Sequence, residues 1–137
     1  MTEKINKIFV YGTLMSDFIN PASDRLRKES HLMGKVSLSG RLFDLGDYPG
    51  GVFEPASTCR IKGELYRLHD AANSLSWLDD YEDAGTGVNP EILYRRIQVP
   101  VSFRGRRITA WMYHYIKPVE GLKRIISGDY NEYLGNK

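Results

Sequence analysis

Residues Ile8–Leu14, with the sequence IFVYGTL, predict a buried strand that ends in a tight turn close to the start of the chain. Ile8, Phe9 and Val10 form a short apolar run with β-favouring side chains, and Gly12 ends it. Gly12 allows positive φ and close backbone approach, so we expect the next N–H groups to converge on one point. Such a group of donors suits a carboxylate or a phosphate. The alternative is a plain first strand with a glycine turn, because short motifs often arise by chance.

The composition of the chain is that of a soluble globular protein. Its 137 residues favour one domain, residues 1–137, with a core large enough to fold unaided. Hydrophobic residues make up 42% and charged residues 26%, which is the usual mix for a soluble globule. The formal net charge of +2 is too small to indicate binding to nucleic acid or to a membrane surface. The basic cluster at 104–107 (RGRR) lies between two strand-like runs, so we expect a solvated hairpin tip there.

The single cysteine and the N-terminal sequence favour a cytoplasmic location. Cys59 excludes an internal disulfide and fits a reducing compartment. The residues after Met1 lack the apolar segment of a signal peptide, and no stretch is long and apolar enough to span a bilayer. We therefore expect a cytoplasmic protein without a membrane partner, present as a monomer or a weak homodimer.

Turn residues divide the chain into short strands and a few short helices. Asn20 and Pro21 suit the N-cap and first position of a helix, and residues 22–30 have few apolar side chains, so this helix should lie on the surface. Residues 45–52 (LGDYPGGV) have the glycines and proline of a loop. Alternating apolar and polar residues predict further strands at 36–42, 60–68, 94–103 and 108–116. Five or more strands beside two or three short helices indicate an α+β fold with mostly antiparallel pairing.

A second helix brings one carboxylate to an unexpected place. Asp70 is a suitable N-cap for a short helix that continues to about residue 80. Three apolar residues recur at helical spacing and should face the core: Ala71, Leu75 and Leu78. One more turn of this face reaches Glu82, which places a charged side chain on the apolar side at the end of the helix. The alternative is that the helix frays before Glu82 and leaves it in solvent.

The histidines and the cysteine form no pattern that binds a metal or activates a nucleophile. The histidines at 31, 69 and 114 have no second ligand at metal spacing, and Cys59 stands alone. The sequence has no Gly-x-Ser-x-Gly elbow, Walker loop or dinucleotide fingerprint, and Gly85 and Gly87 lack the lysine of a phosphate loop. We expect an enzyme on this chain to work without a cofactor or a metal, through carboxylates, hydroxyls and backbone donors.

Several stretches, taken in order, are more specific than any one of them alone. Val10–Leu14 (VYGTL), Leu45–Gly50 (LGDYPG) and Trp77–Glu82 (WLDDYE) are followed by Tyr94–Arg96 and Ala110–Tyr113. This series resembles the gamma-glutamylcyclotransferase-like family, especially its small branch that includes gamma-glutamylamine cyclotransferases. The resemblance extends over nearly the whole chain. It implies a small, mostly antiparallel β-barrel with a few short helices packed around it.

The resemblance also implies which residues form the site. Four residues at the end of the first strand would line the cavity: Tyr11, Gly12, Thr13 and Leu14. The catalytic carboxylate of the family corresponds to Glu82, the residue that the helical pattern already singled out. Asp83 stands where the family usually has glycine, and the loop 83–91 is long, which bears on loop geometry and substrate choice. An aromatic residue of the late strand would help to wall the pocket, either Tyr113 or, on the same face, Tyr115.

The implied activity is an intramolecular cyclisation of a small gamma-glutamyl compound. The α-amino group would attack its own γ-carbonyl, which closes 5-oxoproline and releases an amine or amino acid. Glu82 would act as general acid and base, and the N–H groups of residues 12–14 would hold the substrate α-carboxylate. The amine half of the substrate is left open by the sequence. The alternative is a non-catalytic small-molecule binding or interaction domain on the same fold.

Overall fold

The computed structural model describes residues 5–82 and 93–135, and within them the chain forms seven strands and three helices. The elements in chain order are β1 (Lys7–Val10), α1 (Pro21–Glu29), β2 (Ser30–Asp44), β3 (Pro49–Phe53), β4 (Arg60–Leu68), α2 (Ala71–Tyr81), β5 (Tyr94–Phe103), β6 (Arg106–Tyr115), β7 (Lys123–Ile125) and α3 (Tyr130–Gly135). The predicted α+β class is therefore confirmed.

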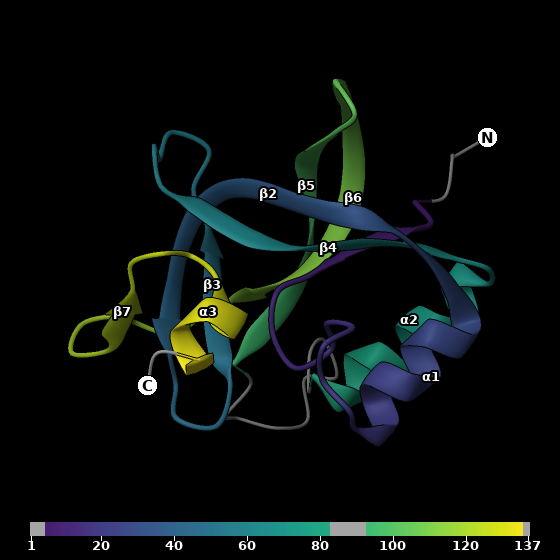
Figure 1. Ribbon diagram of the computed structural model, residues 1–137, viewed down its shortest axis with the longest axis horizontal. Helices are drawn as coiled ribbons and strands as arrows, with labels where there is room; N and C mark the ends of the chain where they lie inside the picture. Colours follow the sequence, from purple (N-terminus) through teal and green to yellow (C-terminus); the bar gives the residue numbers. More distant parts are fainter. Residues whose placement is uncertain (1–4, 83–92, 136–137) are drawn as a thin grey trace.

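The strands form one strongly curved sheet. Their order is β3-β2-β4-β1-β6-β5, and β7 pairs with β2 outside this series. Every described pairing is antiparallel except that of β1 with β6. The long strand β2 arches over the molecule, and α1 and α2 lie together on one side of it (Figure 1). The sheet bends into a nearly closed barrel with short helices around it, as the family resemblance implied.

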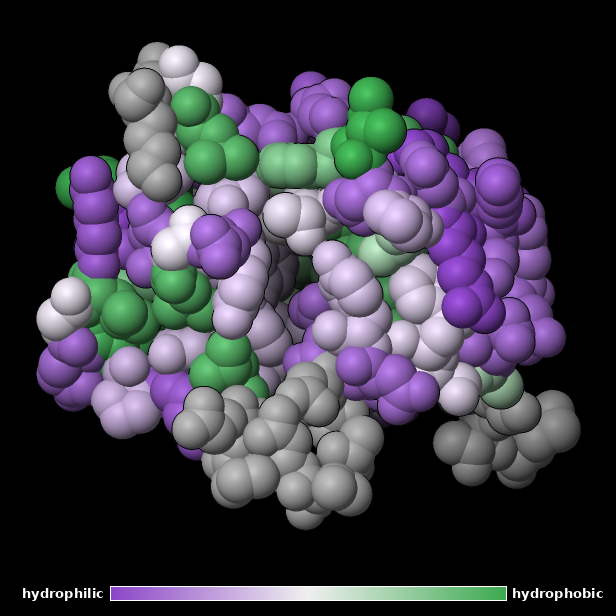
Figure 2. All heavy atoms as spheres, turned by 90° about the horizontal axis from the view of Figure 1, so that it is seen from below, coloured by the Kyte–Doolittle hydropathy of each residue, from purple (hydrophilic) through white to green (hydrophobic). Residues whose placement is uncertain are grey.

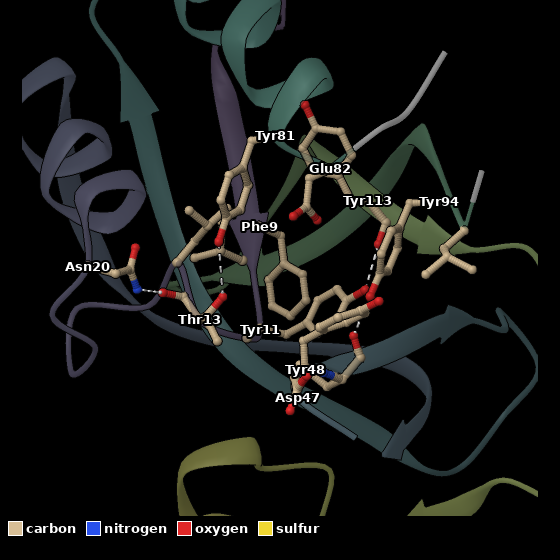
Figure 3. Close-up of a pocket in the computed structure, with 15 residues that line it drawn as sticks. Phe9, Tyr11, Thr13, Asn20, Asp47, Tyr48, Tyr81, Glu82, Tyr94 and Tyr113 are labelled. Carbon is tan, nitrogen blue, oxygen red and sulfur yellow. Dashed lines mark hydrogen bonds between the residues drawn. The ribbon is translucent and has the colours of Figure 1, made fainter. Parts of the chain in front are cut away.

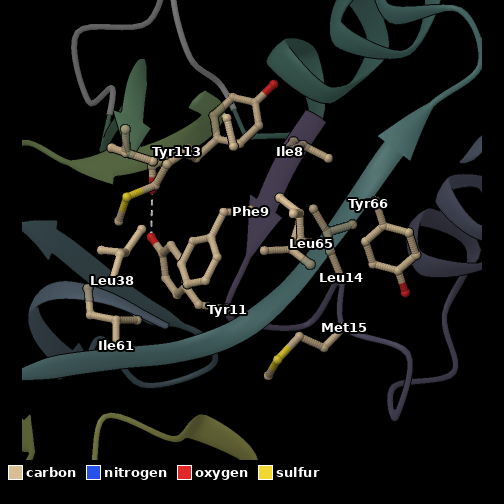
Figure 4. Packing of buried hydrophobic residues seen from close by; sticks show 14 of the residues in the cluster. Ile8, Phe9, Tyr11, Leu14, Met15, Leu38, Ile61, Leu65, Tyr66 and Tyr113 are labelled. Atoms are coloured by element: carbon tan, nitrogen blue, oxygen red, sulfur yellow. Dashed lines mark hydrogen bonds between the residues drawn. The ribbon is translucent and has the colours of Figure 1, made fainter. Parts of the chain in front are cut away.

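β1 lies inside the sheet and is buried on both faces. Ile8 is 0% exposed and its neighbours Phe9 and Val10 are also buried, although consecutive strand residues point to opposite faces. They pack in a cluster that extends to Leu38, Leu65 and other apolar residues (Figure 4). Burying one such side chain stabilises the fold by about 1.5–3 kcal/mol. The strand that ends at the site is thus anchored by the core.

Residues 45–52 were predicted to be a loop, and this prediction is wrong for its second half. Residues Pro49–Phe53 form β3, which pairs antiparallel with β2. Its glycines serve packing rather than a turn: a Cβ on Gly50 would lie 2.9 Å from Cγ of Tyr115, and one on Gly51 would lie 2.8 Å from Cζ of Tyr11. Because these two glycines have no side chains, two tyrosine rings can contact the strand. The residues next to the glycines in the sequence do not indicate this packing.

Both helices begin where the sequence placed them. Asn20 caps α1 in a capping box with Ser23, and Asp70 caps α2 by accepting from the N–H of Asn73. α1 buries Ala22, Ser23 and Leu26 against the barrel, which is more contact than its polar sequence indicated. In the described part of the chain, none of the helices combines the length and the hydropathy that crossing a membrane requires.

Candidate active site

A cavity of about 660 Å³ opens where β1 ends (Figure 3). The surface seen from below is hollowed near its middle (Figure 2). The described lining residues come from β1 and its following turn, the β2–β3 turn, the end of α2, and β5 and β6: Phe9, Val10, Tyr11, Gly12, Thr13, Leu14, Asn20, Asp47, Tyr48, Pro49, Tyr81, Glu82, Leu93, Tyr94 and Tyr113. All six residues predicted for the site are among them.

The turn after β1 forms one end of the cavity. The carbonyl of Gly12 accepts a hydrogen bond of 3.0 Å from the N–H of Met15. The N–H groups of Thr13 and Leu14 lie inside this turn and have no acceptor among the described residues. Of the two properties expected of Gly12, positive φ is absent. Close approach is present, because a Cβ there would lie 2.9 Å from Cγ of Pro49.

Two groups from outside the turn hold it in place. The Asn20 side chain, which caps α1, donates a hydrogen bond of 2.9 Å to the carbonyl of Thr13. Glu64 of β4, only 4% exposed, accepts hydrogen bonds of 2.6 Å from both the N–H and the hydroxyl of Ser16. Hydrogen bonds to charged groups are among the stronger ones in proteins. The sequence placed Glu64 on a strand but provided no sign that it holds this turn.

Glu82 forms the C-cap of α2 and is half-buried. Its N–H donates to the carbonyl of Leu78, so the helix continues to this residue and does not fray before it. The carboxyl group points into the cavity, between the rings of Tyr81 and Tyr113 (Figure 3). Burial raises the pKa of Glu82 from 4.5 to about 7. A carboxyl group with this pKa can both accept and donate a proton near neutral pH.

Tyrosine side chains build the wall of the cavity, and the hydroxyl groups of the buried ones, Tyr11, Tyr94 and Tyr113, are bound to the protein. Tyr11 donates to the carbonyl of Tyr113 over 2.6 Å and accepts from the N–H of Gly51 over 3.0 Å. Tyr94 donates to the carbonyl of Pro49 over 2.7 Å. Burial raises the pKa of Tyr11 and of Tyr94 above the usual range, so both stay neutral. The wall is therefore aromatic and rigid.

Tyr113 contributes its ring to the cavity and its hydroxyl to a network outside it. The hydroxyl donates to Asp79 over 2.7 Å, and the same carboxylate forms an ion pair with Arg96 over 2.8 Å. Burial, followed by the bond to Asp79, raises the pKa of this tyrosine. Tyr115, left open by the sequence as a wall residue, does not line this cavity and borders a second one instead.

Several lining residues were missed by sequence analysis. Asp47 and Tyr48 lie in the LGDYPG stretch, and their position beside a family-like motif was the available signal. Tyr94 begins β5 and lies in the family-like stretch Tyr94–Arg96, which was the available signal for it as well. The predicted loop 83–91, including Asp83, lies outside the described residues. Among residues 5–82 and 93–135, no group of three or more His, Cys, Asp or Glu side chains could hold a metal ion.

Comparisons with known proteins agree with this architecture. Residues 8–132 match the family model described as "Gamma-glutamyl cyclotransferase, AIG2-like". The gamma-glutamylcyclotransferase family protein YtfP of Escherichia coli K12 is 34% identical over 125 residues, which are 90% of this chain and 95% of that protein.

Solved structures show the same fold. The solution structure of Escherichia coli ytfP has 33% identity to this chain and a TM-score of 0.65. The match covers 93% of this chain and 97% of the ytfP chain. The crystal structure of an AIG2-like protein from Mus musculus has 22% identity and a TM-score of 0.71, with 93% and 89% covered, and supports the fold alone. The match to the family model and the identity to YtfP show that this chain belongs to the AIG2-like gamma-glutamylcyclotransferase family.

Proposed function

We propose that this protein is a gamma-glutamyl cyclotransferase-type enzyme that converts a small gamma-glutamyl compound into 5-oxoproline and a free amine or amino acid. The observation that carries the proposal is the Glu82 carboxyl group, which points into the cavity with its pKa raised to about 7. Family membership supports the same reaction class.

The reaction requires two protons to leave the α-nitrogen, because this nitrogen is mostly ammonium in the substrate at neutral pH and carries a single hydrogen in 5-oxoproline. Glu82 first removes one proton, and the free amine attacks the γ-carbonyl carbon, which forms the new C–N bond of a tetrahedral intermediate. Glu82 gives this proton to the leaving nitrogen as the bond between that nitrogen and the γ-carbon breaks. The ring nitrogen loses its second proton to Glu82, and the released amine takes it up to become an ammonium ion, so that no net proton is gained or lost. General acid–base help of this kind typically accelerates a reaction about 10²–10⁴-fold.

The turn after β1 would orient the substrate for this attack. The N–H groups of Thr13 and Leu14 can donate to the substrate α-carboxylate, which sets the amino group close to Glu82. Positioning matters greatly here, because oriented intramolecular attacks reach effective molarities of roughly 10⁵ M and above. Glu64 and Asn20 hold the turn and so preserve this geometry.

The aromatic wall would favour the reaction by excluding water. The hydroxyls of Tyr11 and Tyr94 are bound to main-chain groups, so they do not compete with Glu82 for the substrate proton. Apolar rings around a carboxyl group also keep its pKa high, which is the condition for a base that must later act as an acid. The proposed chemistry uses no cofactor, metal or covalent intermediate.

The test is release of 5-oxoproline, measured by mass spectrometry, from a panel of gamma-glutamyl amines and dipeptides. Wild type and Glu82→Gln are compared, with Glu120→Gln as a matched loss of a carboxylate away from the cavity. We expect turnover of at least one panel member, a fall in kcat of about 10²–10⁴-fold in Glu82→Gln, and full activity in Glu120→Gln. Folding of each variant is checked by circular dichroism.

Two results would overturn the proposal. Activity that survives in Glu82→Gln would remove this residue from the mechanism. Binding of panel members without any turnover would favour a non-catalytic binding domain on the same fold.

A further inference from the structure

The cavity has an acidic character that the whole chain does not share. The chain carries 19 Lys and Arg residues against 17 Asp and Glu residues. Among the described lining residues there is no Lys, Arg or His, whereas Asp47 and Glu82 both carry carboxyl groups. The sequence of residues 83–92 also contains no Lys, Arg or His. A negatively charged part of a substrate would therefore find only N–H and hydroxyl donors in this cavity.

The two carboxyl groups occupy different parts of the cavity. Glu82 lies beside the tyrosine wall at the end of α2, and Asp47 lies on the opposite side, next to Tyr48 (Figure 3). Asp47 and Tyr48 are exposed, the latter to 39%, so they form the mouth. Glu82 is half-buried and belongs to the inner part. Asp47 is thus separated from the group that would perform the chemistry.

The turn that carries Asp47 is held in place, so its charge has a defined position. The N–H of Leu45 donates to the carbonyl of Tyr48 over 3.0 Å, and the Asp44 carboxylate accepts from the N–H of Gly46 over 2.7 Å. The Asp47 carboxylate itself makes no ion pair within residues 5–82 and 93–135. It is available to a cation that reaches the mouth.

In the reaction proposed above, the short glutamyl half would occupy the space between the Thr13–Leu14 turn and Glu82. The leaving group would then extend toward the mouth. An amino acid as leaving group brings a carboxylate toward Asp47, where like charges repel. An amine with a second, protonated nitrogen brings an ammonium group, which Asp47 attracts and which can lie against the ring of Tyr48.

We infer that the preferred substrates are gamma-glutamyl amides of diamines or polyamines, and that Asp47 selects them by pairing with the distal ammonium group. This inference rests on the proposed function, and it adds the class of leaving group. It distinguishes the amine from the amino acid alternatives that the sequence left open.

The experiment compares three synthetic amides that share a pentamethylene spacer and differ only at its far end. The end groups are ammonium (from cadaverine), methyl (from hexylamine) and carboxylate (from 6-aminohexanoate). We expect kcat/KM for 5-oxoproline release to decrease in that order, with about a tenfold ratio between the cationic and anionic amides. The ratio should shrink as salt concentration rises, because Asp47 is exposed.

Variants assign the preference to one residue. Asp47→Asn should bring the cation-to-anion ratio close to one, Asp47→Glu should retain most of it, and Glu120→Gln, which removes the same charge elsewhere, should keep the wild-type ratio. Equal ratios in wild type and Asp47→Asn, or a preference for the anionic amide, would overturn the inference.

Calorimetric binding of the three amides to wild type separates this inference from the proposed function. Tighter binding of the cationic amide that depends on Asp47, without turnover, would support the selectivity and refute the catalysis. Turnover without a charge preference would support the catalysis and refute the selectivity. Failure of all three amides to bind would overturn the inference as well.

Discussion

Two of the cavities lined by the described residues have similar size and opposite chemistry. The one at the end of β1 has a volume of about 660 Å³ and is lined by tyrosines and carboxyl groups. The other, of about 620 Å³, lies between β3, the strands β5 and β6, and the segment after β6. Its charged residues are mostly basic, with Arg41, Arg95 and Lys117 against Glu120, and His114 also lines it.

The cavities differ most in how their polar groups are bound. In the second cavity, Arg41 forms a two-bond ion pair with Glu54 over 2.7 Å, and His114 accepts a hydrogen bond of 3.0 Å from the N–H of Phe53. Burial, and then the charge of Arg95, lowers the pKa of His114, which favours its neutral form. In the first cavity, burial holds the pKa of Glu82 near 7. Volume therefore does not distinguish the two cavities, whereas a carboxyl group with a raised pKa does.

The largest expected effect concerns the stability of Glu82→Gln as a function of pH. The pKa of Glu82 is about 7 in the folded protein against 4.5 for an unperturbed glutamate. The protonated form thus stabilises the fold fully below the lower pKa, and this contribution is lost as pH rises through the higher one. Because glutamine does not ionise, the variant should gain about 3 kcal/mol over wild type between about pH 4 and pH 8.

Urea unfolding at several pH values measures this difference. Glu120→Gln is the matched control from the second cavity and should follow wild type at every pH, since Glu120 is exposed. If the free energies of unfolding of Glu82→Gln and wild type differ by the same amount at every pH, the Glu82 carboxyl lies in solvent. That result would remove the contrast between the two cavities.

A smaller effect is expected from Glu64→Gln. The substitution removes the charge that accepts two hydrogen bonds from Ser16, and so loosens the turn that would bind substrate. We expect KM in the 5-oxoproline assay to rise roughly tenfold while kcat changes less, because ordering the turn then opposes binding. Ser16→Ala retains the main-chain hydrogen bond and should give a weaker version of this effect. A fall in kcat with KM unchanged would contradict a positioning role.

The smallest effect is expected in the second cavity. Arg41→Gln breaks the ion pair with Glu54 at a site that the proposed reaction does not use. We expect kcat/KM for 5-oxoproline release to stay within about twofold of wild type, as is usual for surface substitutions far from a site. Steady-state kinetics on the substrate used for Glu64→Gln makes the measurement directly comparable. A large loss of activity would show that the two cavities are coupled.

Local features of the fold were predictable because each depends on neighbours in the chain. The apolar run Ile8–Val10 became β1, and the caps Asn20 and Asp70 begin α1 and α2. The basic cluster at 104–107 lies at the tip of the β5–β6 hairpin, where Arg104 and Gly105 adopt positive φ. Backbone sterics and capping hydrogen bonds act over a few residues, so short stretches of sequence are enough to predict these features.

The features that sequence analysis missed depend on contacts between distant segments. β3 was predicted to be a loop because its glycines are typical of turns. Gly51 instead allows the strand to contact Tyr11, which is forty residues away in the chain. Glu64 and Ser16 are forty-eight residues apart. Such pairings follow from how the strands fold together, and no local pattern of apolar residues or turn residues encodes them.

The sequence by itself determined the α+β class, the short buried strand before Tyr11–Gly12, the helix that begins after Asp70, and the resemblance to a family. Only the tertiary structure decided that Glu82 is half-buried and lines the cavity, which tyrosines form the wall, and that Asp47 lies on the opposite side. The physical reason is that a pKa and a cavity are properties of what surrounds a group. Those surroundings come from β1, α2, β5, β6 and the β2–β3 turn, which become neighbours only when the barrel closes.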